Sequence, residues 1–178
     1  MRYSYDKLDR LEETLDPAGR KESYTYDSVG NLTKKTVNDT RVTSYAYDAN
    51  GNLTSLTNAL GQTETKKYDN MNRLVQETDA TGAKTTYQYD GKGQLLSSTD
   101  GNGNTTAVAY DGNGNVISVT DGEGRQVRYA YDLADRLTEA MAGDASYENR
   151  NTYTYDEVGN LTSTTDGNGN KMTYTYDL

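Results

Sequence analysis

The sequence predicts an all-β protein, an antiparallel β-hairpin repeat array that forms a curled sheet, a roll or a partial shell. Three observations support this. The dipeptide Tyr-Asp recurs nine times, with a spacing of 21 residues that is broken once. The residues before each dipeptide alternate as they do in a strand. Residues that favour turns stand at fixed offsets after each Asp.

Each repeat opens with the pattern Tyr-x-Tyr-Asp-x-x-Gly-Asn-Leu, which predicts a strand, a tight turn and a second strand. Tyr24 and Tyr26 are two residues apart, so both rings are expected on one face of a strand. Gly30, three residues after Asp27, suits a turn position with positive φ, and Leu32 begins the next strand. The motif residues to which we assign this structural role are Tyr5, Asp6, Tyr26, Asp27, Tyr47, Asp48, Tyr68, Asp69, Tyr89, Asp90, Tyr110, Asp111, Tyr131, Asp132, Tyr155, Asp156, Tyr176 and Asp177.

A second turn follows about ten residues after each Tyr-Asp. In Asp16-Pro17-Ala18-Gly19, Asp at the first position and Gly at the fourth suit a type I turn, and Pro17 stands where its fixed φ fits. The runs between turns are rich in Thr and Tyr and show no helical period. Each repeat should contribute two strands of about five to seven residues, and the chain a meander of about sixteen strands.

The repeats fill the chain almost from end to end, so we expect a single domain, residues 1–178, of about eight repeats. One spacing is 24 residues instead of 21, which places a three-residue insertion between Met141 and Tyr147. Nothing resembles an export signal and no apolar run approaches membrane length. We therefore expect a soluble chain without a membrane span.

Composition excludes several functions. Without His or Cys there is no disulfide, no zinc cluster and no imidazole base. A net charge of −9 with no basic face argues against nucleic acid as a partner. Leu 14, Val 9 and Ile 1 are few, and Phe and Trp are absent, so the 17 Tyr are expected to complete a mixed Tyr/Leu/Val packing layer in place of an aliphatic interior. Equivalent rings should lie roughly 9.5 Å apart, beyond direct contact, because they are two strands apart.

The units Tyr26-Asp27-x-x-Gly30-Asn31-Leu32 and Tyr155-Asp156-x-x-Gly159-Asn160-Leu161 resemble the Tyr-Asp (YD, or Rhs) repeat, and the resemblance covers the entire chain. The family includes bacterial Rhs and wall-associated polymorphic toxins, the shell subunits of Tc toxin complexes, and the teneurins. The resemblance implies a β-sheet strip that spirals into a hollow shell, which in the toxins encloses a C-terminal cargo. It also implies an extracellular or bacterial cell-surface location. Whole shells use far more repeats, so this chain looks like an excised or miniature strip.

Two motifs can be interpreted either as functional sites or as turns. Asp16-Pro17-Ala18-Gly19 resembles the autoproteolytic signature of Rhs proteins, but it lies in the register of the second turn, and we interpret it as a turn. Asp100-Gly101-Asn102-Gly103 and its equivalents resemble the start of a calcium loop. They lack Gly at the sixth and Glu at the twelfth position, so we predict turns, no metal and no cofactor, and leave calcium open.

We predict a structural scaffold module, a strip of the shell that encapsulates or presents a C-terminal cargo, and not an enzyme. Nine equivalent carboxylates do not form the asymmetric acid/base pair that glycoside hydrolysis needs. The partners expected are other YD repeats in the same or a neighbouring chain and a toxin cargo. One alternative is an adhesion module that binds glycans or surfaces through its Tyr rows. A second is self-assembly into filaments or a homo-oligomer through open strand edges.

Overall fold

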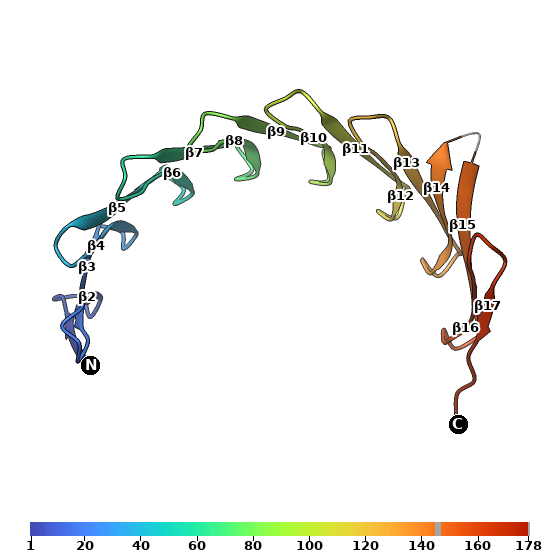
Figure 1. Cartoon of the computed structure of the whole chain (residues 1–178), viewed down its shortest axis with the longest axis horizontal. Helices are drawn as coiled ribbons and strands as arrows, with labels where there is room; N and C mark the ends of the chain where they lie inside the picture. The colour runs from blue at the N-terminus through green and yellow to red at the C-terminus, as the bar shows by residue number, and fades with distance from the viewer. Residues whose placement is uncertain (145–146, 178) are drawn as a thin grey trace. The chain divides into compact units, whose positions relative to one another are not determined.

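The computed structural model describes residues 1–144 and 147–177, and for Asp144, Tyr147 and Glu148 the backbone only. The described residues form 17 β-strands and no helix (Figure 1). The strands are β1 (Arg2–Tyr5), β2 (Leu11–Leu15), β3 (Lys21–Tyr26), β4 (Leu32–Val37), β5 (Arg41–Tyr47), β6 (Leu53–Thr57), β7 (Thr63–Tyr68), β8 (Leu74–Thr78), β9 (Lys84–Tyr89), β10 (Leu95–Thr99), β11 (Thr105–Tyr110), β12 (Val116–Thr120), β13 (Gln126–Tyr131), β14 (Leu137–Asp144), β15 (Tyr147–Tyr155), β16 (Leu161–Thr165) and β17 (Lys171–Thr173).

The chain divides into two compact units, Met1–Thr86 and Tyr87–Leu178. Each strand pairs in antiparallel fashion with the next strand along the chain. The predicted all-β array of antiparallel hairpins is confirmed. The strands number one more than sixteen because β17 begins a further repeat.

A meander places alternate turns at opposite edges of its sheet. Within each unit, the Tyr-Asp turns therefore follow one another along one edge, and the second turns follow one another along the other (Figure 1). The recurring Asp residues are thus neighbours in space as well as equivalents in sequence.

Both kinds of turn have the same construction. After β3, the Gly30 amide donates to the Asp27 carbonyl at 3.3 Å, and the Asp27 amide donates to the Asn31 carbonyl at 2.9 Å. Gly30 has a φ of +101°. A tight turn that ends in a left-handed residue is a common three-residue hairpin loop. The turn that begins at Asp16 has the same bonds, so one turn chemistry serves both edges.

Two hairpins depart from this scheme. Between β4 and β5, Asn38 and Asp39 both have positive φ, 50° and 54°, as the two central residues of a type I′ turn require, and the Thr40 amide donates to the Val37 carbonyl at 3.3 Å. Strands β14 and β15 have 8 and 9 residues, longer than the strands around them. This lengthening falls in the repeat with the predicted insertion, of which residues 145 and 146 lie outside the described residues.

A β-bulge accompanies the Tyr-Asp end of the hairpins. In the β3–β4 pair, Thr25 faces Lys34 but Tyr26 faces Leu32, so Thr33 has no opposite residue. The same shift occurs in β1–β2, β5–β6, β7–β8, β11–β12, β13–β14 and β15–β16. A bulge bends its strand and re-aims the neighbouring side chain, here the tyrosine before each Asp.

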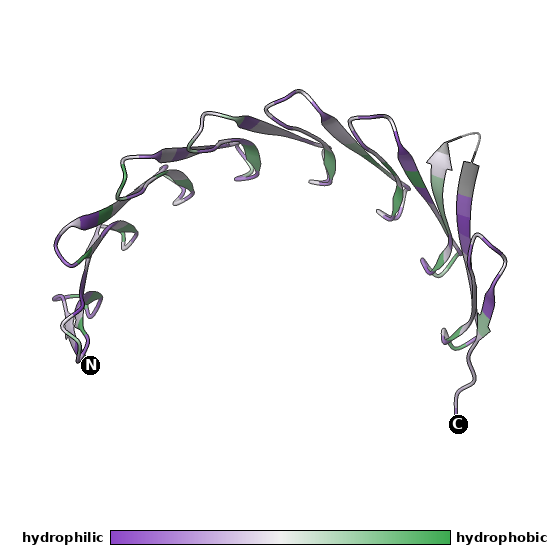
Figure 2. Cartoon of the chain, in the orientation of Figure 1, coloured by the Kyte–Doolittle hydropathy of each residue, from purple (hydrophilic) through white to green (hydrophobic). Residues whose placement is uncertain are grey.

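The mixed Tyr/Leu/Val packing layer that the sequence predicts does not form a buried interior. No hydrophobic side chain among the described residues is buried, and the two buried residues there are Thr14 and Ser163. The Tyr rings of the inner strands are half-buried, whereas Tyr3, Tyr5 and Tyr176 are more than half exposed. The reason is that each unit is a single layer of sheet, in which a ring is covered from the sides only. Figure 2 shows short hydrophobic stretches distributed over all the hairpins instead of one block.

Candidate functional site

The tyrosine of most Tyr-Asp pairs connects its repeat to the repeat before it. Its hydroxyl donates a hydrogen bond to the backbone carbonyl of the Leu or Val that begins the preceding even-numbered strand. Tyr47 reaches the Leu32 carbonyl at 3.0 Å in this way. Seven such bridges of 2.8 to 3.0 Å join described residues, from Tyr26, Tyr47, Tyr68, Tyr110, Tyr131, Tyr155 and Tyr176.

The bridge forms where the backbone ladder between repeats has ended. Strands β4 and β5 pair from Val37 and Arg41 as far as Lys34 and Ser44, and Leu32 lies beyond the last pair. The Leu32 carbonyl has no strand partner on that side, and the Tyr47 hydroxyl supplies one. A side-chain hydrogen bond from a phenol therefore links the two strands beyond the last backbone pair.

The aspartates of the pairs from Asp6 to Asp156 close their own turns. One carboxylate oxygen of Asp27 accepts the amides of Val29 and Asn31 at 3.0 and 2.8 Å, and the other accepts the Asn31 side-chain amide at 3.0 Å. Asn58 makes the corresponding contacts with Leu60 and Gln62 in a second turn. This is the capping that makes Asp and Asn frequent in turns.

These bonds stabilise the ionised carboxylates. The Asn52 side chain, followed by the Asn52 amide, lowers the pKa of Asp48 below its ordinary value of 3.8. Asn115 acts in the same manner on the pKa of Asp111, and Asn170 on that of Asp166. Hydrogen bonds to the charged form of an acid always act in this direction. The turns consequently hold fixed negative charge at neutral pH.

Arginine replaces the asparagine at the end of some Tyr-Asp turns and reaches further. Arg10 Nε bonds Asp6 Oδ2 at 2.7 Å, Arg10 Nη1 donates to the Asp27 carbonyl at 2.9 Å, and its guanidinium carbon lies 4.8 Å from the Tyr26 ring centroid. Arg136 repeats all three contacts in the other unit, with Asp132, the Asp156 carbonyl and the Tyr155 ring. We call this arrangement the arginine clamp.

Sequence reasoning missed the clamp, although a signal was present. Arg10, Arg73 and Arg136 are spaced by 63 residues, which is three repeats. Each follows a left-handed Asp or Asn in place of Gly, namely Asp9, Asn72 and Asp135. A search for a longer period on top of the 21-residue period would have found it.

A charged cluster lies on the Tyr-bearing face of the first unit. Glu22 accepts the Tyr24 hydroxyl at 2.6 Å and pairs with Lys35 at 3.0 Å and Arg20 at 2.6 Å. These bonds, the Tyr24 hydroxyl first, lower the pKa of Glu22 to about 2. The Lys35 ammonium also lies 5.5 Å from the Tyr24 ring centroid. The cluster ties β3 to β4 and is satisfied internally.

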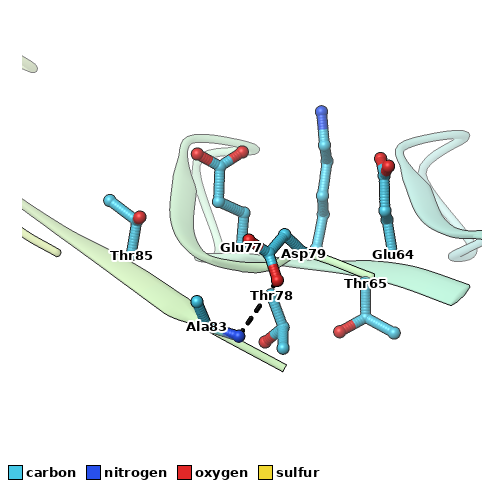
Figure 3. Close-up of a pocket in the computed structure, with 8 residues that line it drawn as sticks. Glu64, Thr65, Glu77, Thr78, Asp79, Ala83 and Thr85 are labelled. Atoms are coloured by element: carbon cyan, nitrogen blue, oxygen red, sulfur yellow. Dashed lines mark hydrogen bonds between the residues drawn. The ribbon is translucent and has the colours of Figure 1, made fainter. Parts of the chain in front are cut away.

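The Tyr row is interrupted at Lys66, which stands where most repeats have the first tyrosine. A shallow hollow of about 290 Å³ opens there, lined by Glu64, Thr65, Lys66, Glu77, Thr78, Asp79, Ala83 and Thr85. In Figure 3, Glu64 and Glu77 rise on one side of the strands, while Thr65 and Thr78 point to the other. The Asp79 side chain is already engaged by the Ala83 amide at 3.0 Å. The hollow is lined mainly by Thr and charged residues and is open to solvent, without a convergent set of reactive groups.

The predicted motif residues do not converge on one centre. Tyr5 lies on the first strand, Tyr89 ends β9, and Asp90 accepts the amides of Lys92 and Gln94 at 2.8 Å each. Asp177 is exposed. Within residues 1–144 and 147–177, no group of three acidic side chains could hold a metal ion. In the Asp100 turn, both carboxylate oxygens are engaged by Asn102 and Asn104.

The repeated bridges and capped turns define a β-repeat protein. Its recurring side-chain hydrogen bonds hold successive repeats and turns together. The family model of the teneurin YD-shell matches residues 1–144, and that of the RHS repeat matches residues 149–171 and 155–178. The chain belongs to the YD-shell family, and the resemblance stated from its residues is confirmed. No match was found among curated proteins.

Solved structures show the same fold. The crystal structure of TcdB2-TccC3-Cdc42 is 18% identical, with a TM-score of 0.64 over 98% of this chain and 12% of that one. TcdB2-TccC3 without its hypervariable C-terminal region has the same identity and coverage and a TM-score of 0.63. The Photorhabdus luminescens Tc holotoxin pore is 18% identical, with a TM-score of 0.52 over 92% of this chain and 11% of that one. The chain thus spans about an eighth of the first two chains.

Proposed function

We propose that the chain is a wall segment of a β-shell, without catalysis of its own, which together with further repeats encloses or presents a C-terminal cargo. The bridge from seven of the Tyr-Asp tyrosines to the preceding repeat is the observation that carries the proposal. A contact made in the same way by many repeats supports a continuous wall, because a catalytic centre would need one repeat to differ from the others.

In this proposal, the nine Tyr-Asp pairs are structural residues, the tyrosines between repeats and the aspartates within turns. Residues 1–178 act as one repeat domain whose nearest partners are other YD repeats. An extracellular or cell-surface location goes with such a role. In the described part of the chain, no helix is long and apolar enough to cross a membrane.

The test is a chimera in which this chain replaces the matching segment of the TcdB2-TccC3 chain. We expect the chimera to protect its C-terminal segment from added protease as well as the parent shell does. The same C-terminal segment fused to this chain alone should be cut rapidly, because a wall segment does not enclose cargo by itself. A folded chimera whose C-terminal segment is cut as rapidly as in that fusion would overturn the proposal.

Glycan binding is a second candidate, favoured by one hollow of about 440 Å³ in the second unit. Tyr153 and Met172 offer apolar surface there, and Asn151, Asp166 and Asn170 offer polar groups. An aromatic ring beside amides and carboxylates suits a sugar ring. A glycan array should then show hits that Tyr153→Ala abolishes and Tyr129→Ala retains, and an array without hits would reject this candidate.

Self-assembly is a third candidate. In the register of the described residues, β1 pairs with β2 and β17 pairs with β16, which leaves one side of each without a recorded strand partner. Such an edge can accept another strand. Light scattering at increasing concentration should show a growing mass if the edges pair between copies, and a constant monomer mass would exclude it.

A further inference from the structure

Within each unit, side chains cross most of the grooves between adjacent Tyr-Asp turns. The arginine clamp closes the groove between the first and second turns, and a second clamp closes the groove that Arg136 spans. Asn50 and Asn52 reach Asn72 across another groove at 2.9 and 2.8 Å. Asn113 and Asn115 reach Asp135 in the same manner, and Lys92 reaches the Gly112 carbonyl at 3.1 Å.

The groove between the second and third turns differs. Asn31 stands in the place of Arg10, and its side chain bonds Asp27 within its own turn. Gly51 stands where Asn72 and Asp135 present an acceptor in other turns. Between residues 27–33 and 45–51, the one recorded side-chain bond across the groove is that from the Tyr47 hydroxyl to Leu32. An open cavity of about 750 Å³ remains, lined by both turns.

This open groove contains the equivalents of every group that holds Arg10. Asp27 Oδ2 corresponds to Asp6 Oδ2, the Asp48 carbonyl to the Asp27 carbonyl, and the Tyr47 ring to the Tyr26 ring. The Asp48 carbonyl accepts the Gly51 amide, just as the Asp27 carbonyl accepts the Gly30 amide while also binding Arg10. Carbonyl and carboxylate oxygens have lone pairs for a second donor.

The charge of the groove suits a cation. Its lining holds Asp27 and Asp48 and no basic residue. Lys35, on β4 like the lining residue Thr33, is engaged by Glu22 at 3.0 Å. The pKa of Tyr47 is raised, first by its partial burial and then by the nearby Tyr45 and Asp27, so one carboxylate of the lining lies close to this ring.

We propose that the groove formed by Asp27, Tyr47 and Asp48 binds the guanidinium group of an arginine side chain that another polypeptide segment presents. The two clamps are internal precedents, since the same set of groups holds a guanidinium in both units of the chain. A guanidinium fits better than an ammonium because it is planar, stacks on a ring and donates in two directions at once. The proposal does not depend on the enclosure of cargo.

The experiment titrates the isotope-labelled full chain with the peptide acetyl-Gly-Arg-Gly-amide at low salt. The backbone amide signals of the chain are followed by NMR. We expect saturable shifts at Val29, Asn31, Asn50 and Gly51, with a Kd on the order of 1 mM. The peptide with Lys in place of Arg should bind about threefold more weakly or worse, and the citrulline peptide should cause no saturable shift. Shifts that the lysine peptide reproduces equally, or no saturable shift at all, would overturn the proposal.

Two variants make the test specific. Asn31→Arg supplies the missing side chain from within and should weaken peptide binding at least tenfold, while the matched neutral change Asn31→Gln should retain it. Arg10→Gln should open the first groove. A second set of saturable shifts should then appear at the amides of Leu8 and of position 10. If Asn31→Arg is folded and still binds the peptide as the parent chain does, the groove is not the site and the proposal is wrong.

Discussion

A Tyr-Asp tyrosine that forms the bridge makes two contributions that most residues supply separately. Its ring covers the layer beside it, and its hydroxyl satisfies a backbone carbonyl at the point where the ladder between repeats has ended. Phe would give the first contribution without the second, so the bridge gives a physical reason for Tyr and not Phe at these positions. The hydroxyl is therefore the part of the residue to test.

Replacing Tyr47 by Phe keeps the ring and removes the bridge to Leu32. We expect a loss of about 1 kcal/mol in the free energy of unfolding, because a partly buried carbonyl loses its partner. Hydrogen exchange should accelerate most in β4 and β5. Tyr45→Phe is the matched control on the same face of the same strand, since no hydrogen bond of its hydroxyl is recorded. Equal losses for the two variants would show that the bridge contributes nothing.

At the level of residues, the sequence predicted types and positions better than contacts. Asp and Gly could be placed because turn geometry demands them locally. The ring spacing of roughly 9.5 Å suggested that the rings of successive repeats do not touch, but the hydroxyl contact to the adjacent strand was not foreseen. It depends on the bulge beside Tyr47 and on the early end of the β4–β5 ladder, and neither leaves a mark in residue type.

At the level of elements, the turn decides where each hairpin reverses. The left-handed fourth residue is required by the loop, and nothing lies within 4 Å of a Cβ added at Gly51, whose φ is +86°. Steric crowding therefore does not explain why Gly stands there. The positive φ explains it, and Asn72 in the same position, with a φ of 60°, shows that Asn also tolerates this backbone conformation.

Gly51→Ala should destabilise the chain by about 1 to 2 kcal/mol through backbone strain alone. Gly51→Asn should cost less, as the presence of Asn72 indicates. Gly112→Ala is the control, because Gly112 lies in an equivalent turn, has no positive φ and also has open space around its Cβ position. Urea unfolding compares the three, and a loss for Gly112→Ala as large as that for Gly51→Ala would contradict the role assigned to φ.

At the level of the whole molecule, the turn aspartates make stability depend on pH. Eleven of them have a pKa below the ordinary value of 3.8. Unfolding restores a pKa near 3.9. The unfolded chain then binds more protons, so their contribution is present above about pH 4 and is lost as the pH falls through the lower folded values.

The midpoint of urea unfolding should therefore fall steeply between about pH 4 and pH 2 and stay nearly constant from about pH 5 to pH 7. Asp48→Asn should make this fall shallower, because it removes one titrating cap while Asn58 shows that Asn can close such a turn. A midpoint that rises on acidification would mean that relief of the net charge of −9 outweighs the caps.

The repeat also predicts how the chain tolerates deletion, since each repeat contacts mainly its neighbours. Removing residues 48–68 takes out one whole period and joins Tyr47 to Asp69, which restores a Tyr-Asp pair in register. We expect the sheet signal in circular dichroism to remain, with a smaller dependence of stability on urea because less surface is exposed on unfolding.

Removing residues 49–68 instead takes out 20 residues and places Asp48 before Asp69, one position out of phase. A slip of one residue sends side chains to the opposite face, so this variant should lose the hairpins around the junction. If both deletions unfold alike, the continuity of the sheet does not rest on the register of the tyrosine bridges.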